Sequence, residues 1–462
     1  MIQLIAMIAC VIGIAGLFVM ERQDKVPTSK ALWLPLAWLL INGSRSVSQW
    51  FTGSTNLDTA RYTEGTPGDA AIFGVLIAGG LLILNLRSSK VRRFLHANLP
   101  LLLFFAYCII SIVWSDYPFV AMKRMVKAIG DIVMVLVVLT DPYPLTAMKR
   151  LFARTAFILL PMSLLLILFY PDLGTYFDSY SNITYYNGVT TQKNSLGQTC
   201  LVCGLGLLWL LLSAYDARKM PYRRTHLMVY GALLATAIFL IVKADSMTSL
   251  SCFAIAGAVM VMSTQRWVAA RAGGIHAIVI GAVGLAVFAV FLDSAGSLLH
   301  SLGRNATLTG RTDIWRAVLA LHTNPLLGTG YESFWLGNRL QFVWDATDKG
   351  ILQAHNGYLE IYINLGWVGV ILLGGLIVTG YRNALAAFYR DPYAGRLGLA
   401  FFTASLMFSL SEAGFRMMNL IWFAFLLAIT GIPSSLLSEK HLTMVELPAA
   451  KALRPTRVRI LQ

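Results

Sequence analysis

Thirteen apolar runs constrain this chain more than any other feature of its sequence. About 17 to 25 consecutive apolar residues in a helix cross the hydrocarbon core of a bilayer. The runs lie near residues 2–20, 31–51, 69–86, 97–114, 119–140, 151–170, 195–214, 227–242, 248–264, 274–292, 356–379, 397–413 and 417–433. We therefore predict an all-α polytopic integral membrane protein with about 12 to 13 transmembrane helices. The second run is the weakest, because polar residues interrupt it at 42–45.

Composition excludes two classes of protein. The 462 residues are 57% hydrophobic and 13% charged, which leaves too little polar surface for a soluble enzyme. The net charge of +15 could suggest nucleic-acid binding. Proteins of that class, however, present their positive charge on a polar surface that this chain lacks. We expect a lipid bilayer as partner and no nucleic acid.

The positive charge is divided unevenly between alternate loops. Loops after odd-numbered runs, together with the C-terminal tail, contain 24 of the 37 Lys and Arg residues and carry a net charge of +17, against −2 for the other half. Cytoplasmic loops carry the Lys and Arg excess in membrane proteins. The odd loops are therefore predicted to be cytoplasmic and the N-terminus to face outward. Residues 1–20 lack a charged n-region and a small-residue cleavage site, so we expect a retained span.

One predicted outward loop, over 293–355, is much longer than the others. Connections of this length are uncommon unless they are functional or disordered. This one is rich in Trp, Tyr and Phe, which would allow it to fold onto the membrane domain. The predicted parts are transmembrane helices 1 to 10 over 1–292, the large loop over 293–355, helices 11 to 13 over 356–433 and a cytoplasmic basic tail over 434–462.

Two side chains in the large loop suit chemistry on an anionic substrate. Apolar residues at helical spacing predict an amphipathic helix over 312–322, with Arg311 at its positive end, where an anion could bind. The alternative is a solvated arginine. His355 closes the loop and could act as a general base near neutral pH. The alternative there is a polar cap.

A polar face follows His355 on the next predicted helix. Asn356, Glu360 and Asn364 repeat every four residues and therefore share one face. Ionisable groups inside a membrane are costly and usually face a cavity, which favours a substrate site. Glu360 could instead form a structural ion pair with Arg416, which lies near Glu412 in the sequence.

A few cations stand on the side predicted to be poor in positive charge. Lys193 and Asn194 lie at the entrance to the seventh run, and Arg124 lies with two lysines at the start of the fifth. A phosphate or pyrophosphate head group would explain such cations. Snorkelling to lipid phosphates is the alternative.

The cysteines do not form a metal-binding pattern. All five lie in apolar runs, where thiols behave as small hydrophobic groups. Cys200 and Cys203 have the spacing of a metal or redox pair, but neither His nor further Cys residues accompany them. We expect no disulfide, no metal and no cofactor.

These residues give the chain a clear resemblance to the superfamily of O-antigen ligases and of O-antigen and exopolysaccharide polymerases. It covers residues 185–435 best and is closest to the exopolysaccharide polymerases. In that family a His and a polar residue, followed by two spaced glycines, end the large periplasmic loop. The matching residues here are His355, Asn356, Gly366 and Gly369, with Arg311, Trp315, the glycine turn of Gly328, Gly330 and Tyr331, and the segment Lys193, Asn194, Leu196 and Gly197.

The chain departs from the family in two respects. Ligases often have Arg where Lys193 stands. Well-known polymerases have two strongly basic outer loops, whereas residues 171–194 contain Lys193 as their single basic residue. A simple model in which two basic loops exchange the substrate is therefore poorly supported.

The resemblance implies an enzyme that transfers a glycan from undecaprenyl pyrophosphate to a sugar hydroxyl, at the periplasmic face of a bacterial inner membrane. It would be a metal-independent, inverting glycosyltransferase. The implied roles are His355 and Arg311 as catalytic residues and Lys193, Asn194, Arg124, Asn356 and Glu360 as substrate-binding residues.

The preferred activity is polymerisation of lipid-linked repeat units, because the overall pattern looks most like exopolysaccharide polymerases. One alternative is a ligase that transfers the glycan to lipid A core or protein. Another is a transporter or flippase of lipid-linked sugars. Polysaccharide export or chain-length proteins are expected as further partners.

Overall fold

The computed structural model describes residues 1–22, 26–52, 65–178, 182–217, 222–265, 268, 272–294, 309–347 and 350–431. The predicted basic tail over 434–462 and residues 295–308 of the predicted large loop lie outside the described residues. The N-terminal half contains α1 (Ile2–Glu21), η1 (Lys30–Leu32), α2 (Trp33–Asn42), α3 (Val47–Thr52), α5 (Pro67–Leu86), α6 (Ser88–Ala97), α7 (Leu99–Ile110), η2 (Ser111–Trp114), α8 (Pro118–Leu139), α9 (Pro144–Phe169) and α10 (Pro171–Gly174). There follow β1 (Thr175–Asp178), β2 (Ile183–Tyr186), α11 (Lys193–Asp216), α12 (Arg223–Lys243), α13 (Met247–Met262), α15 (Ala272–Ser294), α16 (Thr309–Ala320), α17 (Gly337–Thr347), α18 (Gly357–Arg390), α19 (Pro392–Phe408) and α20 (Leu420–Ile429).

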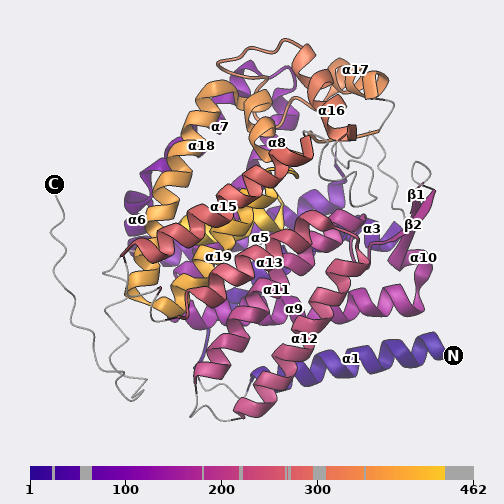
Figure 1. Cartoon of the computed structure of the whole chain (residues 1–462), viewed down its shortest axis with the longest axis vertical. Coiled ribbons are helices and arrows are strands. Elements are labelled where there is room, and N and C mark those ends of the chain that lie inside the picture. The colour runs from indigo at the N-terminus through magenta and orange to yellow at the C-terminus, as the bar shows by residue number, and fades with distance from the viewer. Residues whose placement is uncertain are drawn as a thin grey trace.

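The chain is an all-α polytopic membrane protein, which confirms the predicted fold class (Figure 1). Within the described residues, six helices are long and apolar enough to cross a membrane: α1, α5, α9, α11, α12 and α18. The pair α6 and α7, bent by 89°, would make a seventh. Other predicted runs form shorter apolar helices, such as α13 and α20, so fewer helices meet this criterion than the 12 to 13 predicted.

The second predicted run is divided by a buried arginine. The chain turns between α2 and α3, and Arg45 in this turn is 2% exposed. Its guanidinium donates hydrogen bonds to the carbonyl oxygens of Thr190 at 3.2 Å and Gly188 at 3.4 Å, and also to that of Leu173. A buried charged group requires such partners. The position therefore suits a break in the helix, at which the turn between α2 and α3 is hydrogen-bonded to the segment 173–190, and it does not suit a continuous span.

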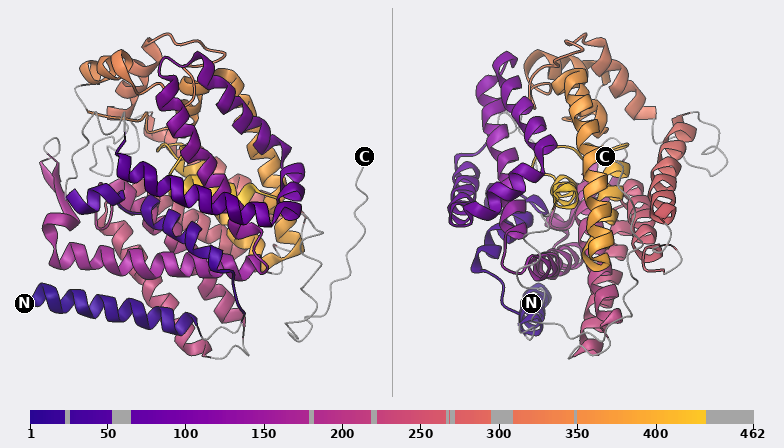
Figure 2. Two further views of the ribbon diagram at one scale, coloured as in Figure 1. Left: turned by 180° about the vertical axis from the view of Figure 1, so that it is seen from behind. Right: turned by 90° about the vertical axis from the view of Figure 1, so that its left-hand side faces the viewer.

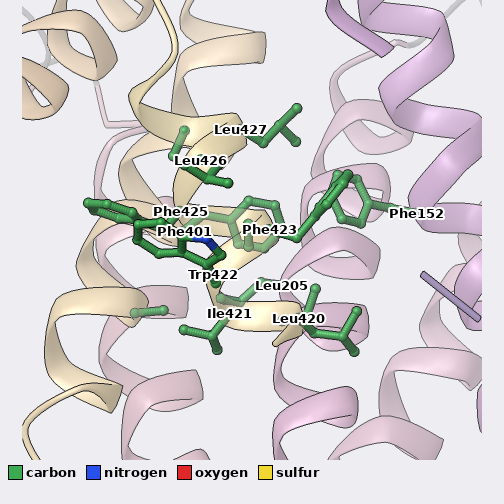
Figure 3. Packing of buried hydrophobic residues seen from close by; sticks show 14 of the residues in the cluster. Phe152, Leu205, Phe401, Leu420, Ile421, Trp422, Phe423, Phe425, Leu426 and Leu427 are labelled. Carbon is green, nitrogen blue, oxygen red and sulfur yellow. The ribbon is translucent and has the colours of Figure 1, made fainter. Parts of the chain in front are cut away.

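The interior is built around α20, whose ten residues are all buried. A helix that is apolar on every side belongs in the centre of a bundle. Figure 3 shows Phe401, Trp422 and Phe425 gathered at this helix, with Phe152 of α9 on the facing side. The rings of Phe152 and Phe401 are 5.1 Å apart. By contrast, α1 lies along the edge of the molecule in both views of Figure 2, and its apolar side chains are largely exposed, as suits a lipid-facing helix.

The large loop folds around a hydrophobic cluster that is separate from the main core and to which α18 contributes Ile363. Figure 1 shows α16 and α17 together at one end of the molecule. Ile314 and Val318 of α16 pack in one buried cluster with Val343 of α17 and with Phe334 and Trp335 from the segment between the helices. The amphipathic helix predicted over 312–322 is thus confirmed as α16.

A two-stranded hairpin lies beside the start of α11. In this antiparallel pair, Tyr176 of β1 faces Tyr185 of β2. Their ring centroids are 5.9 Å apart, as is typical of a cross-strand aromatic pair. The hairpin and the large loop frame the region that contains most of the predicted site residues.

Candidate active site

The segment 409–419, between α19 and α20, is the main structural element of the site that the sequence did not predict. It is not helical, and hydrogen bonds to other elements hold its backbone in place. The carbonyl of Ser409 accepts the backbone N–H of Gly357 at 2.8 Å, and Asp131 of α8 accepts the N–H of Met418 at 3.0 Å. Asn419 caps α20 by accepting the N–H of Ile421 at 2.9 Å. This anchoring fixes the position of Glu412.

The carboxylate of Glu412 brings three predicted site residues together. Its Oε1 accepts hydrogen bonds from Arg311 of α16 and Asn194 of α11, each at 3.0 Å. Its Oε2 lies 2.9 Å from Nδ1 of His355. The Glu412 side chain is 6% exposed, whereas those of Arg311 and His355 are each 22% exposed. A nearly buried carboxylate therefore contacts two side chains, Arg311 and His355, that solvent can still reach.

His355 has an unusual backbone conformation. Its φ of +50° lies in the left-handed region, which costs energy for a residue other than glycine and is often found at functional sites. The next residue, Asn356, caps α18 by accepting the N–H groups of Tyr358 and Leu359, both at 3.0 Å. The helix cap therefore holds the backbone that presents the imidazole.

Lys193 flanks this cluster and has partners of its own. Its ammonium group lies 3.4 Å from the carboxylate of Asp245 and 3.7 Å from the ring centroid of Tyr185. Its side chain is 24% exposed. It is the residue next to Asn194, so the cation stands at the edge of the Glu412 cluster without sharing its carboxylate.

Arg124 contacts the large loop. The residue is 6% exposed and donates to the carbonyl oxygen of Glu332. The carboxylate of Glu332 forms an ion pair with Arg416 at 3.0 Å, and Arg416 also donates to the carbonyl of Leu352 at 3.1 Å. Both arginines therefore hold the large loop. A contact of Arg124 with substrate stays a prediction.

The polar face of α18 binds the large loop as well. Trp335 donates its indole N–H to Glu360, 3.0 Å from each carboxylate oxygen. The side-chain oxygen of Asn364 accepts the N–H groups of Ser333 at 2.9 Å and Phe334 at 3.1 Å. These are anchoring contacts, and Glu332 takes the place of Glu360 as ion-pair partner of Arg416. Substrate contacts of Asn356 and Glu360 stay predictions.

The glycine turn lies directly against α18. Thr329 and Gly330 donate their N–H groups to the carbonyls of Ile363 at 3.1 Å and Asn364 at 2.9 Å. Gly328 and Gly330 have φ of +69° and +92°, and a Cβ at Gly328 would lie 2.4 Å from the carbonyl carbon of Asn364. Glycine is required here by both the backbone conformation and the close approach.

Among the residues that the structure describes, no three His, Cys, Asp or Glu side chains are grouped so that they could hold a metal ion. The cysteines are free, and Cys200 and Cys203 are buried in α11. The Glu412 cluster itself presents a carboxylate, a guanidinium, an amide and an imidazole.

Comparison with known proteins shows which family and which relative this chain is similar to. A family model described as O-antigen ligase matches residues 229–374, a range that includes Arg311 and His355. The chain is 25% identical over 302 residues to the exopolysaccharide production protein ExoQ of Rhizobium meliloti (strain 1021). This match covers 63% of the chain and 66% of that relative's length.

Proposed function

Because the chain belongs to the superfamily of O-antigen ligases and polymerases, we propose that it is a membrane glycosyltransferase that polymerises oligosaccharide repeat units. The donor would be a repeat unit linked to undecaprenyl pyrophosphate, and the reaction would occur at the periplasmic face of the inner membrane. The observation that carries the proposal is the convergence of Arg311, His355 and Asn194 on the carboxylate of Glu412.

Arg311 and Lys193 have the chemistry needed for the leaving group. As the glycosyl bond breaks, negative charge grows on the pyrophosphate, and cations already in place stabilise that charge in the transition state. A guanidinium can bind two phosphate oxygens at once. Both side chains are partly accessible, at 22% and 24% exposed, so a head group can reach them without unfolding the loop.

His355 has the chemistry needed for the acceptor. We assign it as the general base that takes the proton of the acceptor hydroxyl through Nε2. The hydroxyl oxygen then bonds to the anomeric carbon, and the pyrophosphate leaves with the electrons of the carbon–oxygen bond. A single displacement of this kind inverts the configuration at the anomeric carbon.

The test is polymerisation by purified protein in lipid nanodiscs, with lipid-linked repeat units as substrate. We expect His355→Ala and Arg311→Ala each to lower the rate by about 100-fold or more, since general-base and electrostatic contributions have this size. His322→Ala and Arg316→Ala are matched controls, because both side chains are exposed in the same loop. If correctly inserted His355→Ala and Arg311→Ala proteins extend the substrate at the wild-type rate, the assignment is wrong.

The ligase is the second candidate, favoured by the description of the matching family model. The relative in exopolysaccharide production favours the polymerase. The surface glycan of a deletion strain distinguishes the two. Loss of long chains with retention of single capped units indicates a polymerase, and accumulation of free lipid-linked polymer indicates a ligase.

A further inference from the structure

The two oxygens of Glu412 divide between groups with different chemical tasks. Oε1 accepts the hydrogen bonds of Arg311 and Asn194, and of these Arg311 is the group assigned to anion binding. Oε2 contacts the imidazole of His355, the group assigned to proton transfer. No sequence motif pointed to Glu412, because it lies 57 positions after His355 and 101 after Arg311.

The contact at Oε2 determines which nitrogen of His355 carries the hydrogen. The carboxylate of Glu412 accepts hydrogen bonds from Arg311 and Asn194 at Oε1, and a carboxylate accepts hydrogen bonds but donates none. Nδ1 of His355 must therefore be the donor. In a neutral imidazole this leaves Nε2 with the free lone pair that a base requires.

Nδ1 of His355 has a second contact, with the side-chain amide of Gln353. This contact agrees with a hydrogen on Nδ1 only if the amide oxygen faces the ring. The side-chain amide of Gln353 lies 3.3 Å from Nδ1, with its nitrogen toward the ring. Two donors cannot bond to each other, and the amide oxygen and nitrogen are interchangeable in such an assignment. The shorter contact of 2.9 Å to Glu412 therefore decides the tautomer.

We propose that Glu412 is a positioning residue that couples binding of the pyrophosphate donor to the strength of His355 as a base. The inference rests on the proposed function and deepens it. Without donor, the carboxylate charge is shared between Arg311 and His355. A pyrophosphate that attracts Arg311 weakens the contact at Oε1, so more of the negative charge acts on the Nδ1 hydrogen.

The consequence appears when the proton moves. His355 accepts the hydroxyl proton at Nε2 and becomes an imidazolium, which the carboxylate at Nδ1 stabilises. Donor binding thus prepares the base, and an empty site holds a weaker one. Among the described residues of the surrounding elements, four further charged groups each have a contact of their own: Lys193 with Asp245, Arg416 with Glu332, Arg124 with the carbonyl of Glu332, and Glu360 with Trp335.

The experiment compares Glu412→Gln, Glu412→Asp and the control Asp313→Asn over a range of pH. Asp313 is an exposed acid two residues after Arg311, so its substitution removes a nearby charge without touching the cluster. Glu412→Gln should lower kcat by about 100-fold or more, because an amide can donate to Nδ1 and stabilise the wrong tautomer. It should also move the acidic limb of the pH–rate profile to lower pH, because the charge that favours the imidazolium is gone.

Glu412→Asp keeps the charge and should retain the wild-type position of the acidic limb, even where the shorter side chain lowers the rate. Asp313→Asn should leave both quantities unchanged. A purely structural role of Glu412 would lower the amount of folded protein without moving the limb, and that outcome overturns the inference. A wild-type rate in Glu412→Gln overturns it too, while loss of activity in His355→Ala would still uphold the proposed function.

Discussion

Trp367 donates its backbone N–H to the carbonyl oxygen of Pro325 at 2.9 Å, across a break in α18. The break is at Gly366, where φ is +63° and ψ is −166°. Val368 donates likewise to Leu326 at 3.2 Å. In a continuous helix these N–H groups would bond four residues back. The turn from the large loop replaces those bonds, so that polar backbone at a helix break remains satisfied, as a membrane protein requires.

The first prediction concerns this break. Gly366→Ala should strongly destabilise the protein, by about 2 kcal/mol or more, because alanine tolerates positive φ poorly. The new Cβ would also lie 2.2 Å from the carbonyl oxygen of Leu326. Unfolding in mixed detergent micelles measures the change. Gly374→Ala in the same helix is the control, since no atom beyond its own stretch of helix lies within 4 Å of its Cβ position, and it should not be destabilised. Equal stability of the two variants would contradict the structure of the break.

A buried carboxylate on α8 leads to the second prediction. Asp131 is fully buried, and its two oxygens accept the indole N–H of Trp38 at 2.8 Å and the N–H of Met418 at 3.0 Å. Asp131→Asn offers one acceptor oxygen in place of two, so one buried donor loses its partner. We expect a loss of about 1–3 kcal/mol in the free energy of unfolding.

A double-mutant cycle with Trp38→Phe is the control for Asp131. If the lost partner is that of Trp38, the double variant should be less destabilised than the sum of the single variants. Additive effects together with unchanged activity would show that Asp131 does not anchor the segment that carries Glu412.

The third prediction tests anion binding directly. Arg311→Lys keeps the charge but loses the planar pair of donors, so inorganic pyrophosphate should inhibit the variant at about 10-fold higher concentration than wild type. Arg316→Lys on the same helix is the control, because its side chain is 77% exposed and pairs with Asp313. Equal inhibition of Arg311→Lys and Arg316→Lys by pyrophosphate would exclude Arg311 as the anion contact.

The fourth prediction concerns orientation in the membrane. In a Cys10→Ser background, a cysteine replacing Asp313 should react with an impermeant maleimide on intact spheroplasts, because this side chain is 56% exposed in the loop predicted to face the periplasm. A cysteine replacing Arg390, at the end of α18, should react with the maleimide only after the membrane has been permeabilised. The reverse pattern would invert the topology that the loop charges predict.

Local sequence patterns predicted much of the fold. Runs of apolar residues were sufficient to predict an all-α membrane protein, because the bilayer selects for hydrophobic length. They did not predict the number of spans, since six described helices, or seven with the bent pair, meet the length and composition criterion. The helix over 312–322 was predicted in the same way, from the spacing of residues such as Ile314 and Val318. The break at Arg45 appeared in the sequence as a polar interruption, but its partners at 188 and 190 did not.

The site was predicted in part. His355 and Arg311 were selected from a motif and from a helix start, and the structure brings both to one carboxylate. Asn356, Glu360 and Asn364 were expected to face a substrate cavity because a polar stripe in a membrane helix needs polar neighbours. A helix cap and backbone groups of the large loop supply those neighbours here. A stripe predicts that partners exist without specifying which ones.

The sequence by itself determined the all-α membrane class of the fold and selected the His and Arg of the family resemblance, and it predicts a division of charge between alternate loops. Each of these depends on residues close together in the chain. The tertiary structure alone decided that Glu412 joins them, since its contacts with Asn194, Arg311 and His355 span 218, 101 and 57 positions. Contacts over such distances arise when helices pack and a non-helical segment is anchored between them, and no local pattern encodes that geometry.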